Sequence, residues 1–358
     1  MTLVFFQNCV SPHQIPYIRW CANQTGVSKV IVVAPRIDYE DRVKMGWHSN
    51  MLLENPEVAF ILSPTEEIVE KLLSENSQCN CMFSGIRADE DVFRWFSMSL
   101  SHDVKRFIIT EPPYTYDKPL WMHYIRFFLQ DYRYVKFIDG VFAIGESCVK
   151  YYRSLSRRWK VFPFLYVTNI DNVPSRDLYG GLKVVYVGSL SKRKNVGVLL
   201  KSLLGVHSVE LSVFGEGDER NELERFARKT NLCVKFCGSI GIKEVQSEMA
   251  KYDVLVLPSL HDGWGAVVNE ALAQGLYVIC SDRCGAMALL HEKNRGAIFK
   301  SDNSEDLRRL MSHCANNVEQ IRAGRGARKQ WAKNHISGEA VARYFVDCLT
   351  KDDVKSLF

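Results

Sequence analysis

Long apolar runs are missing from this sequence of 358 residues. No stretch approaches the roughly 18 consecutive apolar residues that a membrane-spanning helix requires. The opening residues, Met-Thr-Leu-Val-Phe-Phe-Gln-Asn, have no basic segment ahead of the apolar one, which favours a strand over a secretory signal. We therefore expect a cytoplasmic protein.

Two common nucleotide-binding motifs are also missing. No Gly-Lys-Ser or Gly-Lys-Thr sequence occurs, which argues against a P-loop enzyme. Gly215 and Gly217 form a Gly-x-Gly pair, but Arg220 stands where a dinucleotide fingerprint has its third glycine. A nicotinamide oxidoreductase is therefore not favoured.

Cysteine is plentiful, yet its spacing does not fit the usual zinc site. The close pairs are Cys79/Cys81, Cys233/Cys237 and Cys280/Cys284, and none has two residues between its members. Most cysteines lie in apolar runs, where the thiol acts as a small buried side chain. Without an export signal, we expect reduced thiols and no bound metal.

The net charge of +5 is unevenly distributed. Residues 1–104 carry 8 Lys and Arg against 13 Asp and Glu, whereas residues 105–160 carry 11 against 5. The basic, aromatic-rich stretch 118–160 predicts a surface for anionic partners and suits peripheral contact with a membrane. A helix that buries its aromatic face would have the same composition. No nucleic-acid-binding motif is recognisable, so we expect no nucleic-acid partner.

Short β-branched runs alternate with amphipathic stretches along the whole chain, which is typical of βαβ units and parallel sheets. The polar segment Thr168–Gly181 lacks periodicity and predicts a linker. We therefore expect two α/β domains that join near residue 175. The predicted strands are Leu3–Asn8, Lys29–Pro35, Val58–Ser63, Cys79–Ser84, Arg106–Thr110, Gly140–Ile144, Val161–Val167, Lys183–Val187, Val209–Phe214, Val234–Cys237, Asp253–Leu257, Tyr277–Ser281 and Gly296–Phe299.

The strongest candidate site lies in the segment Leu257–Asp282. A buried strand is expected to end at Pro258 and a helix to begin near Ala266. The N-terminus of a helix exposes unpaired backbone N–H groups that attract phosphate, and Gly263 and Gly265 would let a phosphate approach closely. An ordinary strand-to-helix crossover with a glycine-rich turn would contain the same residue types.

Two carboxylates, Asp262 and Glu270, flank this loop, and each can accept hydrogen bonds from sugar hydroxyls. The segment resembles the signature of retaining glycosyltransferases of family GT4, also called group 1, although this family usually has Glu where the chain has Asp262. The resemblance implies that Glu270 binds the nucleotide ribose, that Asp262 binds the donor sugar and that the N–H groups after Gly265 hold the diphosphate. The residues that it places around the donor are Gly263, Trp264, Gly265, Ala266 and Val267.

A second constellation follows the strand that ends at Gly188. A basic loop with Lys192, Arg193 and Lys194 precedes a helix. This arrangement suits a diphosphate leaving group, although a solvated basic loop would have the same residues. The segment resembles the family's Gly-Arg-Leu…Lys-Gly stretch, which assigns phosphate binding to Lys194. Ser189 replaces the usual Arg, so we expect Arg193 or Lys192 to supply the missing cation.

Weaker assignments complete the donor site. The resemblance places Gly215 in the turn that lines the donor and Ser239 and Ile240 near the nucleobase, where a plain strand end is the alternative interpretation.

In the N-terminal half, the loop Cys9–Pro16 corresponds to one that often contacts the acceptor. His13, Gln14 and Glu111 are the candidates, although His13 could equally be a residue at the start of a helix. Thr110 stands where many relatives have a His near the reacting sugar.

The resemblance also implies the architecture. It is the GT-B fold, in which two Rossmann-like α/β/α domains with parallel sheets face each other across a deep cleft. We expect an acceptor-binding domain at 1–174, a nucleotide-sugar-binding domain at 175–335 and a C-terminal helix at 336–358 that packs on the first domain.

The implied activity is retaining transfer of a sugar from a nucleoside diphosphate sugar, UDP-sugar favoured, to a glycan or lipid-linked acceptor. Bacterial lipopolysaccharide, O-antigen or capsule synthesis is the expected context, with the protein on the inner face of the plasma membrane. Lys194, Asp262 and Glu270 would carry catalysis without a metal or cofactor, and the C-terminal half has no Asp-x-Asp motif. A GT-B sugar-nucleotide epimerase and a non-catalytic nucleotide-binding scaffold remain alternatives.

Overall fold

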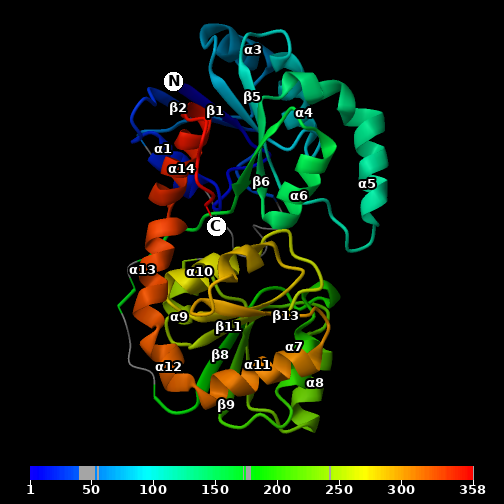
Figure 1. Ribbon diagram of the computed structural model, residues 1–358, viewed down its shortest axis with the longest axis vertical. Helices are drawn as coiled ribbons and strands as arrows, with labels where there is room; N and C mark the ends of the chain where they lie inside the picture. The colour runs from blue at the N-terminus through cyan, green and yellow to red at the C-terminus, as the bar shows by residue number, and fades with distance from the viewer. Residues whose placement is uncertain (40–52, 55, 172, 175–178, 242, 358) are drawn as a thin grey trace. The chain divides into compact units, whose positions relative to one another are not determined.

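The structure is a computed structural model that describes residues 1–39, 53–54, 56–171, 173–174, 179–241 and 243–357. It contains two compact units (Figure 1). Unit 1 comprises Met1–Thr168 and Ser337–Phe358, and unit 2 comprises Asn169–Ile336. Residues 175–178, which adjoin the predicted boundary at 174, lie outside the described residues. None of the described helices is both long and apolar enough to cross a bilayer.

The described strands of unit 1 form one parallel seven-stranded sheet in the order β3-β2-β1-β4-β5-β6-β7. Its strand order reverses between β1 and β4, as in doubly wound folds. The strands are β1 (Thr2–Phe6), β2 (Lys29–Ala34), β3 (Ala59–Leu62), β4 (Asn80–Ser84), β5 (Lys105–Thr110), β6 (Gly140–Ile144) and β7 (Lys160–Phe164).

Helices pack on both faces of this sheet because its buried strands alternate between two cores. Val4 and Phe6 of β1 belong to one core, with residues of α3, α4 and α6. Phe5 points to the other face, where its ring lies 5.6 Å from that of Phe345. The helices are α1 (Ile15–Cys21), α3 (Glu66–Glu75), α4 (Glu90–Ser99), α5 (Leu120–Arg126), α6 (Glu146–Leu155) and α14 (Gly338–Thr350).

The segment after β5 is irregular in its helical geometry. Helix α5 continues into a π-helical turn, η2 (Phe127–Asp131), and then into a 3₁₀ helix, η3 (Tyr132–Phe137), which leads to β6. This run stands at the edge of unit 1, away from the sheet (Figure 1). No side chain of α5 is buried.

Unit 2 repeats the doubly wound plan. Its described strands form one parallel six-stranded sheet in the order β10-β9-β8-β11-β12-β13. The strands are β8 (Leu182–Val187), β9 (Val209–Phe214), β10 (Val234–Gly238), β11 (Val254–Leu257), β12 (Tyr277–Ser281) and β13 (Gly296–Phe299).

The helices of unit 2 form two groups on the two faces of its sheet (Figure 1). The first group is α7 (Val196–Ser202), α8 (Arg220–Lys229) and α11 (Ser304–Asn316), and the second is α9 (Val245–Met249), α10 (Val267–Ala273) and α13 (Arg325–His335). Helix α12 (Val318–Ala323) joins α11 to α13. Helices α12 and α13 meet at Gly324.

Candidate active site

The site in unit 2 lies where the order of its strands reverses. β8 and β11 are neighbours in the sheet, yet β8 leads on to β9 on one side and β11 to β12 on the other. The loops that follow two such strands diverge and leave a crevice at their carboxyl ends, which is where ligands bind in open α/β sheets. The two strongest sequence motifs are these two loops.

Lys194 and Asp262 bring the two loops together. The Lys194 Nζ lies 2.5 Å from the Asp262 Oδ2, and the two side chains are only 16% and 13% exposed. The neighbouring Arg193 donates from Nη1 to the His261 carbonyl at 2.8 Å, and its own carbonyl accepts from the Leu260 N–H at 2.8 Å. The sequence separates these groups by 68 residues, but the fold makes them one cluster.

Backbone contacts fix the loop that carries Asp262. The Asp262 N–H donates to the Arg283 carbonyl at 3.0 Å, and the Asp262 carbonyl accepts from the Gly285 N–H at 3.1 Å. Gly265 has a φ of 93°, and a Cβ on it would lie 2.7 Å from a methyl of Leu257. The carboxylate of Asp262 is therefore held on a loop that is anchored on both sides.

Trp264, which we predicted to bind the donor, is a core residue. Its side chain is 1% exposed, and its indole N–H donates to the Asn269 Oδ1 at 2.7 Å. A side chain with so little exposed surface has almost none to offer a ligand, so we assign the Trp264 ring to holding the loop against α10.

The start of α10 offers backbone donors next to this loop. Ala266 is its N-cap and provides no side-chain cap. Within the part of the chain that the structure describes, the N–H groups of Gly265, Ala266 and Val267 donate no hydrogen bond. Free N–H groups at a helix start form a site for an anionic oxygen.

Glu270 lies in the first turn of α10 and is partly exposed. Among the described residues, its carboxylate makes no hydrogen bond and no ion pair. Burial raises the pKa of Glu270 to about 8, and the negative charge of Asp171 raises it further in the same direction. The carboxyl group of Glu270 can therefore accept from hydroxyl donors, most strongly once it is ionised.

Asp171 belongs to the candidate site, although no sequence pattern indicated it. It lies in the segment before β8, where its N–H donates to the Gln246 Oε1 at 3.1 Å. Gln274, which is fully buried, donates to the same Gln246 oxygen at 2.8 Å and to the Asp171 carbonyl at 3.3 Å. Two buried glutamines thus hold the backbone of Asp171, whose negative charge acts on Glu270, and no local motif encodes this arrangement.

Gly188 and Gly215 pack backbone against backbone. A Cβ on Gly215 would lie 1.8 Å from the Gly188 carbonyl oxygen, and one on Gly217 would lie 2.3 Å from the Leu190 carbonyl oxygen. The Gly188 N–H donates to the Phe214 carbonyl at 3.0 Å. The Gly-Glu-Gly turn therefore holds the loops after β8 and β9 together.

The remaining donor-site candidates lie at the same edge of the sheet. The Ser189 carbonyl accepts a 2.8 Å hydrogen bond from the hydroxyl of the buried Tyr186, which fixes the loop backbone at that point. Ser239 is exposed and Ile240 partly exposed, directly after β10.

The acceptor candidates all belong to unit 1. Gln14 is 6% exposed, and its Oε1 accepts a 2.7 Å hydrogen bond from the Gln7 amide. The carbonyl of the partly buried His13 accepts from the Val167 N–H at 2.9 Å, and its ring lies 5.9 Å from that of Tyr166. Glu111 is exposed after β5.

An Asp-x-Asp sequence does occur in the N-terminal half, at Asp89-Glu90-Asp91. Its first carboxylate caps α4 by accepting from the N–H groups of Asp91 and Val92. Arg36 lies 3.4 Å from the Asp89 carboxylate and 3.7 Å from that of Asp91. These contacts explain the motif as a helix cap.

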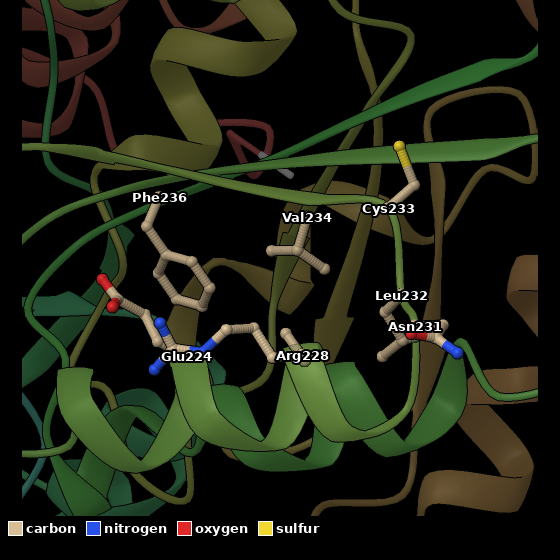
Figure 2. Close-up of a pocket in the computed structure, with 8 residues that line it drawn as sticks. Glu224, Arg228, Asn231, Leu232, Cys233, Val234 and Phe236 are labelled. Carbon is tan, nitrogen blue, oxygen red and sulfur yellow. The ribbon is translucent and has the colours of Figure 1, made fainter.

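A cavity of about 540 Å³ lies elsewhere in unit 2, between α8 and β10 (Figure 2). Leu232, Cys233 and Val234 line it where β10 begins. The two loops of the site follow the opposite, carboxyl ends of their strands. This cavity is therefore separate from the candidate active site.

Comparison with known proteins gives a family for the same region. Residues 178–335 match the family model of the group 1 glycosyl transferases. An uncharacterized glycosyltransferase from Methanocaldococcus jannaschii is 27% identical over 136 residues, which cover 38% of each chain. A lipopolysaccharide core biosynthesis glycosyltransferase from Rhizobium meliloti is 26% identical over 152 residues, or 42% of each chain. The matched region thus spans about two fifths of these relatives.

Solved structures match over nearly the whole length of the chain. The Anabaena protein HepE, crystallised with UDP, superposes with a TM-score of 0.73 at 14% identity, covering 98% of this chain and all of HepE. At that identity the match concerns the fold alone. The predicted fold class is confirmed as two Rossmann-like units with parallel sheets, the GT-B class, and the match to the group 1 glycosyl transferases covers residues 178–335.

Proposed function

We propose that this chain transfers a sugar from a nucleoside diphosphate sugar to a hydroxyl group of a glycan or lipid-linked acceptor, with retention of anomeric configuration. The observation that carries the proposal is the Lys194–Asp262 pair, 2.5 Å apart at the strand-order reversal of unit 2. It places a cation and a carboxylate beside the free N–H groups that begin α10. A diphosphate bonded to a sugar needs all three kinds of group.

Each group has one role in this proposal. Lys194 and the N–H groups of Gly265–Val267 hold the diphosphate and stabilise the negative charge that grows on it. Asp262 accepts from hydroxyls of the donor sugar, and Glu270 accepts from the ribose hydroxyls. His13, Gln14 and Glu111 of unit 1 are the proposed acceptor contacts.

The proposed reaction requires no enzyme nucleophile. The bond between the anomeric carbon and the phosphate oxygen breaks, and the acceptor oxygen bonds to the same face of that carbon. The acceptor hydroxyl gives its proton to the departing phosphate oxygen. The proposal includes no metal and no cofactor.

We favour a UDP-sugar as the donor, because HepE, which has the same fold, was crystallised with UDP. The Rhizobium relative acts in lipopolysaccharide core biosynthesis, which supports a bacterial surface polysaccharide as the context. We place the protein on the cytoplasmic side of the plasma membrane.

A panel of UDP-, GDP- and ADP-sugars tests the proposal. Release of nucleoside diphosphate from one donor is expected, faster with a suitable acceptor, and NMR of the product should show the donor's anomeric configuration. Lys194→Ala should slow turnover roughly 100-fold or more, because it removes a charge partner of the leaving group. Lys229→Ala, an exposed lysine at the end of α8, is the matched control.

Asp262→Asn separates the sugar from the nucleotide. We expect it to weaken binding of the intact donor without weakening that of UDP, because the sugar hydroxyls are the only donor groups proposed to contact Asp262 and the change leaves Lys194 free to bind the diphosphate. Conversion of a donor sugar without an acceptor would show an epimerase instead. Tight nucleotide binding without turnover of any donor would show a scaffold.

A further inference from the structure

The segment 114–136 of unit 1 exposes apolar side chains to an unusual degree. Trp121 is 61% exposed and Leu129 is 80% exposed, on a run of helix that buries almost none of its apolar residues. We call this face the α5 surface. Its exposed large apolar residues are Tyr114, Tyr116, Leu120, Trp121, Met122, Ile125, Phe128, Leu129 and Tyr132.

The opposite side of the same run is firmly attached to unit 1. The Tyr124 hydroxyl lies 2.7 Å from the Ser154 Oγ, and Phe127 is buried with its ring 5.8 Å from that of Trp159. Asp131 makes a 2.6 Å ion pair with Arg87. The residues that contact the rest of unit 1, Tyr124, Phe127 and Asp131, thus follow one another at intervals of three and four.

The outward residues show the same helical spacing. Trp121, Ile125, Phe128 and Tyr132 follow one another at intervals of four, three and four. Two stripes, one in contact with the rest of unit 1 and one exposed, therefore run along one helical segment. A helix that only covered the core of unit 1 would need the first stripe alone.

Cations accompany the exposed stripe. Lys118, Arg126, Arg133 and Lys136 are all exposed, and no ion pair among the described residues joins any of them to a carboxylate. The carboxylate of Asp131 is already paired with Arg87. Asp117 is the other carboxylate of the segment and is exposed. The four cations outnumber it, so the surface combines apolar side chains with an excess of positive charge.

The neighbouring basic run at 150–160 has a different character. Tyr151 is 8% exposed and Trp159 is 6% exposed, so both aromatic rings belong to the core. Within the predicted stretch 118–160, the large exposed apolar side chains all precede residue 133. This confines the candidate contact surface to α5, η2 and the residues next to them.

We propose that the α5 surface docks on an anionic lipid bilayer. Tryptophan and tyrosine favour the level of the lipid headgroups, aliphatic residues and Phe insert below it, and Lys and Arg are attracted to acidic headgroups. Charge complementarity favours this partner over a second copy of the chain. A symmetric dimer through this face would bring the four cations of each copy together.

Vesicle flotation with the full chain tests the proposal, and it needs no sugar donor, so it is independent of the proposed transferase activity. We expect the protein to float with phosphatidylcholine vesicles that contain 30% phosphatidylglycerol, and to bind pure phosphatidylcholine at least tenfold more weakly, because the cations then lack partners. The double variant Phe128→Ser, Leu129→Ser should lose at least nine tenths of the binding. Ile68→Ser, on α3 and 46% exposed, is the matched apolar control.

A second pair of variants tests the charge. Arg126→Gln with Arg133→Gln should weaken binding to the anionic vesicles and reduce its dependence on salt. Lys229→Gln with Lys293→Gln removes the same charge from exposed positions of unit 2 and should change nothing. Equal loss in both pairs would mean attraction by net charge alone and would overturn the proposal.

The depth to which Trp121 enters the bilayer can be measured on the native chain, without variants whose stability is reduced. Brominated lipids in anionic vesicles should quench part of the tryptophan fluorescence of the native chain, and Trp121→Phe should abolish that part. Failure of the native chain to float, or quenching that survives in Trp121→Phe, would overturn the assignment. So would a concentration-dependent dimer that Phe128→Ser, Leu129→Ser dissociates, because the face would then be covered by a second copy.

Discussion

At the scale of single residues, Gly215 has the least room for an added Cβ among the described glycines. Because a Cβ on Gly215 would lie 1.8 Å from the Gly188 carbonyl oxygen, Gly215→Ala must push the loops after β8 and β9 apart. We expect it to destabilise the protein by roughly 3 kcal/mol or more. Gly326→Ala is the matched control, since nothing lies within 4 Å of the added Cβ and the residue is helical. Thermal unfolding should show a large fall in Tm for the first variant only.

The raised pKa of Glu270 predicts that nucleotide binding depends on pH. Its pKa is raised to about 8, so most of the carboxyl group is protonated at neutral pH. Ribose hydroxyls donate to the ionised form, so affinity should rise roughly tenfold between pH 7 and 9 and level off above that range. Asp171→Asn removes a like charge and should move the rise to lower pH.

Calorimetric titration with UDP at several pH values measures this effect. Glu270→Gln provides the reference, because it keeps the ligand's own titration and removes that of the carboxyl group. A rise in affinity that persists unchanged in Glu270→Gln would contradict the assignment.

The sequence placed several of the site residues on the correct local structures. Asp262 was predicted in a loop after a buried strand and Glu270 inside the helix that follows, and both lie there. Their roles toward a ligand stay predictions. Asp171 and the burial of the Trp264 ring were not foreseen, because both depend on contacts between segments distant in sequence.

At the scale of secondary structure, α14 completes the core of unit 1. Its Phe345 is fully buried, with its ring 4.6 Å from that of Phe142 and 5.6 Å from that of Tyr17. Phe345→Ala should therefore cost about 3–5 kcal/mol of unfolding free energy. Phe128→Ala, 54% exposed, makes the same chemical change at the surface and should cost less than about 0.5 kcal/mol.

Chemical denaturation of both variants measures the difference. Similar midpoints for Phe345→Ala and the native chain would show that α14 is dispensable for the stability of unit 1.

The strands were predictable because their signal is local. Each of the predicted strands overlaps an observed one, and β6, β9, β12 and β13 have the predicted bounds. Buried parallel strands consist of short β-branched and aromatic runs, which composition alone reveals. The burial of the segment α5, η2 and η3 was harder to predict. Its own apolar residues lie on two faces, and the periodicity does not indicate which of the two is buried.

At the scale of the whole molecule, the two units differ in how the chain builds them. Unit 2 is a continuous segment, Asn169–Ile336, whereas unit 1 also requires Ser337–Phe358. We expect the isolated segment 169–336 to fold, with a cooperative unfolding transition, because its sheet and helices are all encoded within it. The isolated segment 1–168 should lack such a transition, because the face that holds Phe5, Tyr17 and Phe142 stays uncovered.

Circular dichroism on heating compares the two segments. Joining residues 337–358 to 1–168 through a flexible Gly-Ser linker should restore the transition of unit 1. If 1–168 already unfolds cooperatively with native-like stability, the requirement for α14 is wrong.

The return of α14 to unit 1 sets an order for synthesis on the ribosome. The first sheet is translated early, yet the aromatic ring that fills its second face is carried by Phe345, close to the end of the described chain. Unit 2 is translated before α14 and can begin to form its own core first. The half of the molecule that is made first is therefore expected to finish folding last, and its uncovered aromatic face must be kept from aggregation in the meantime.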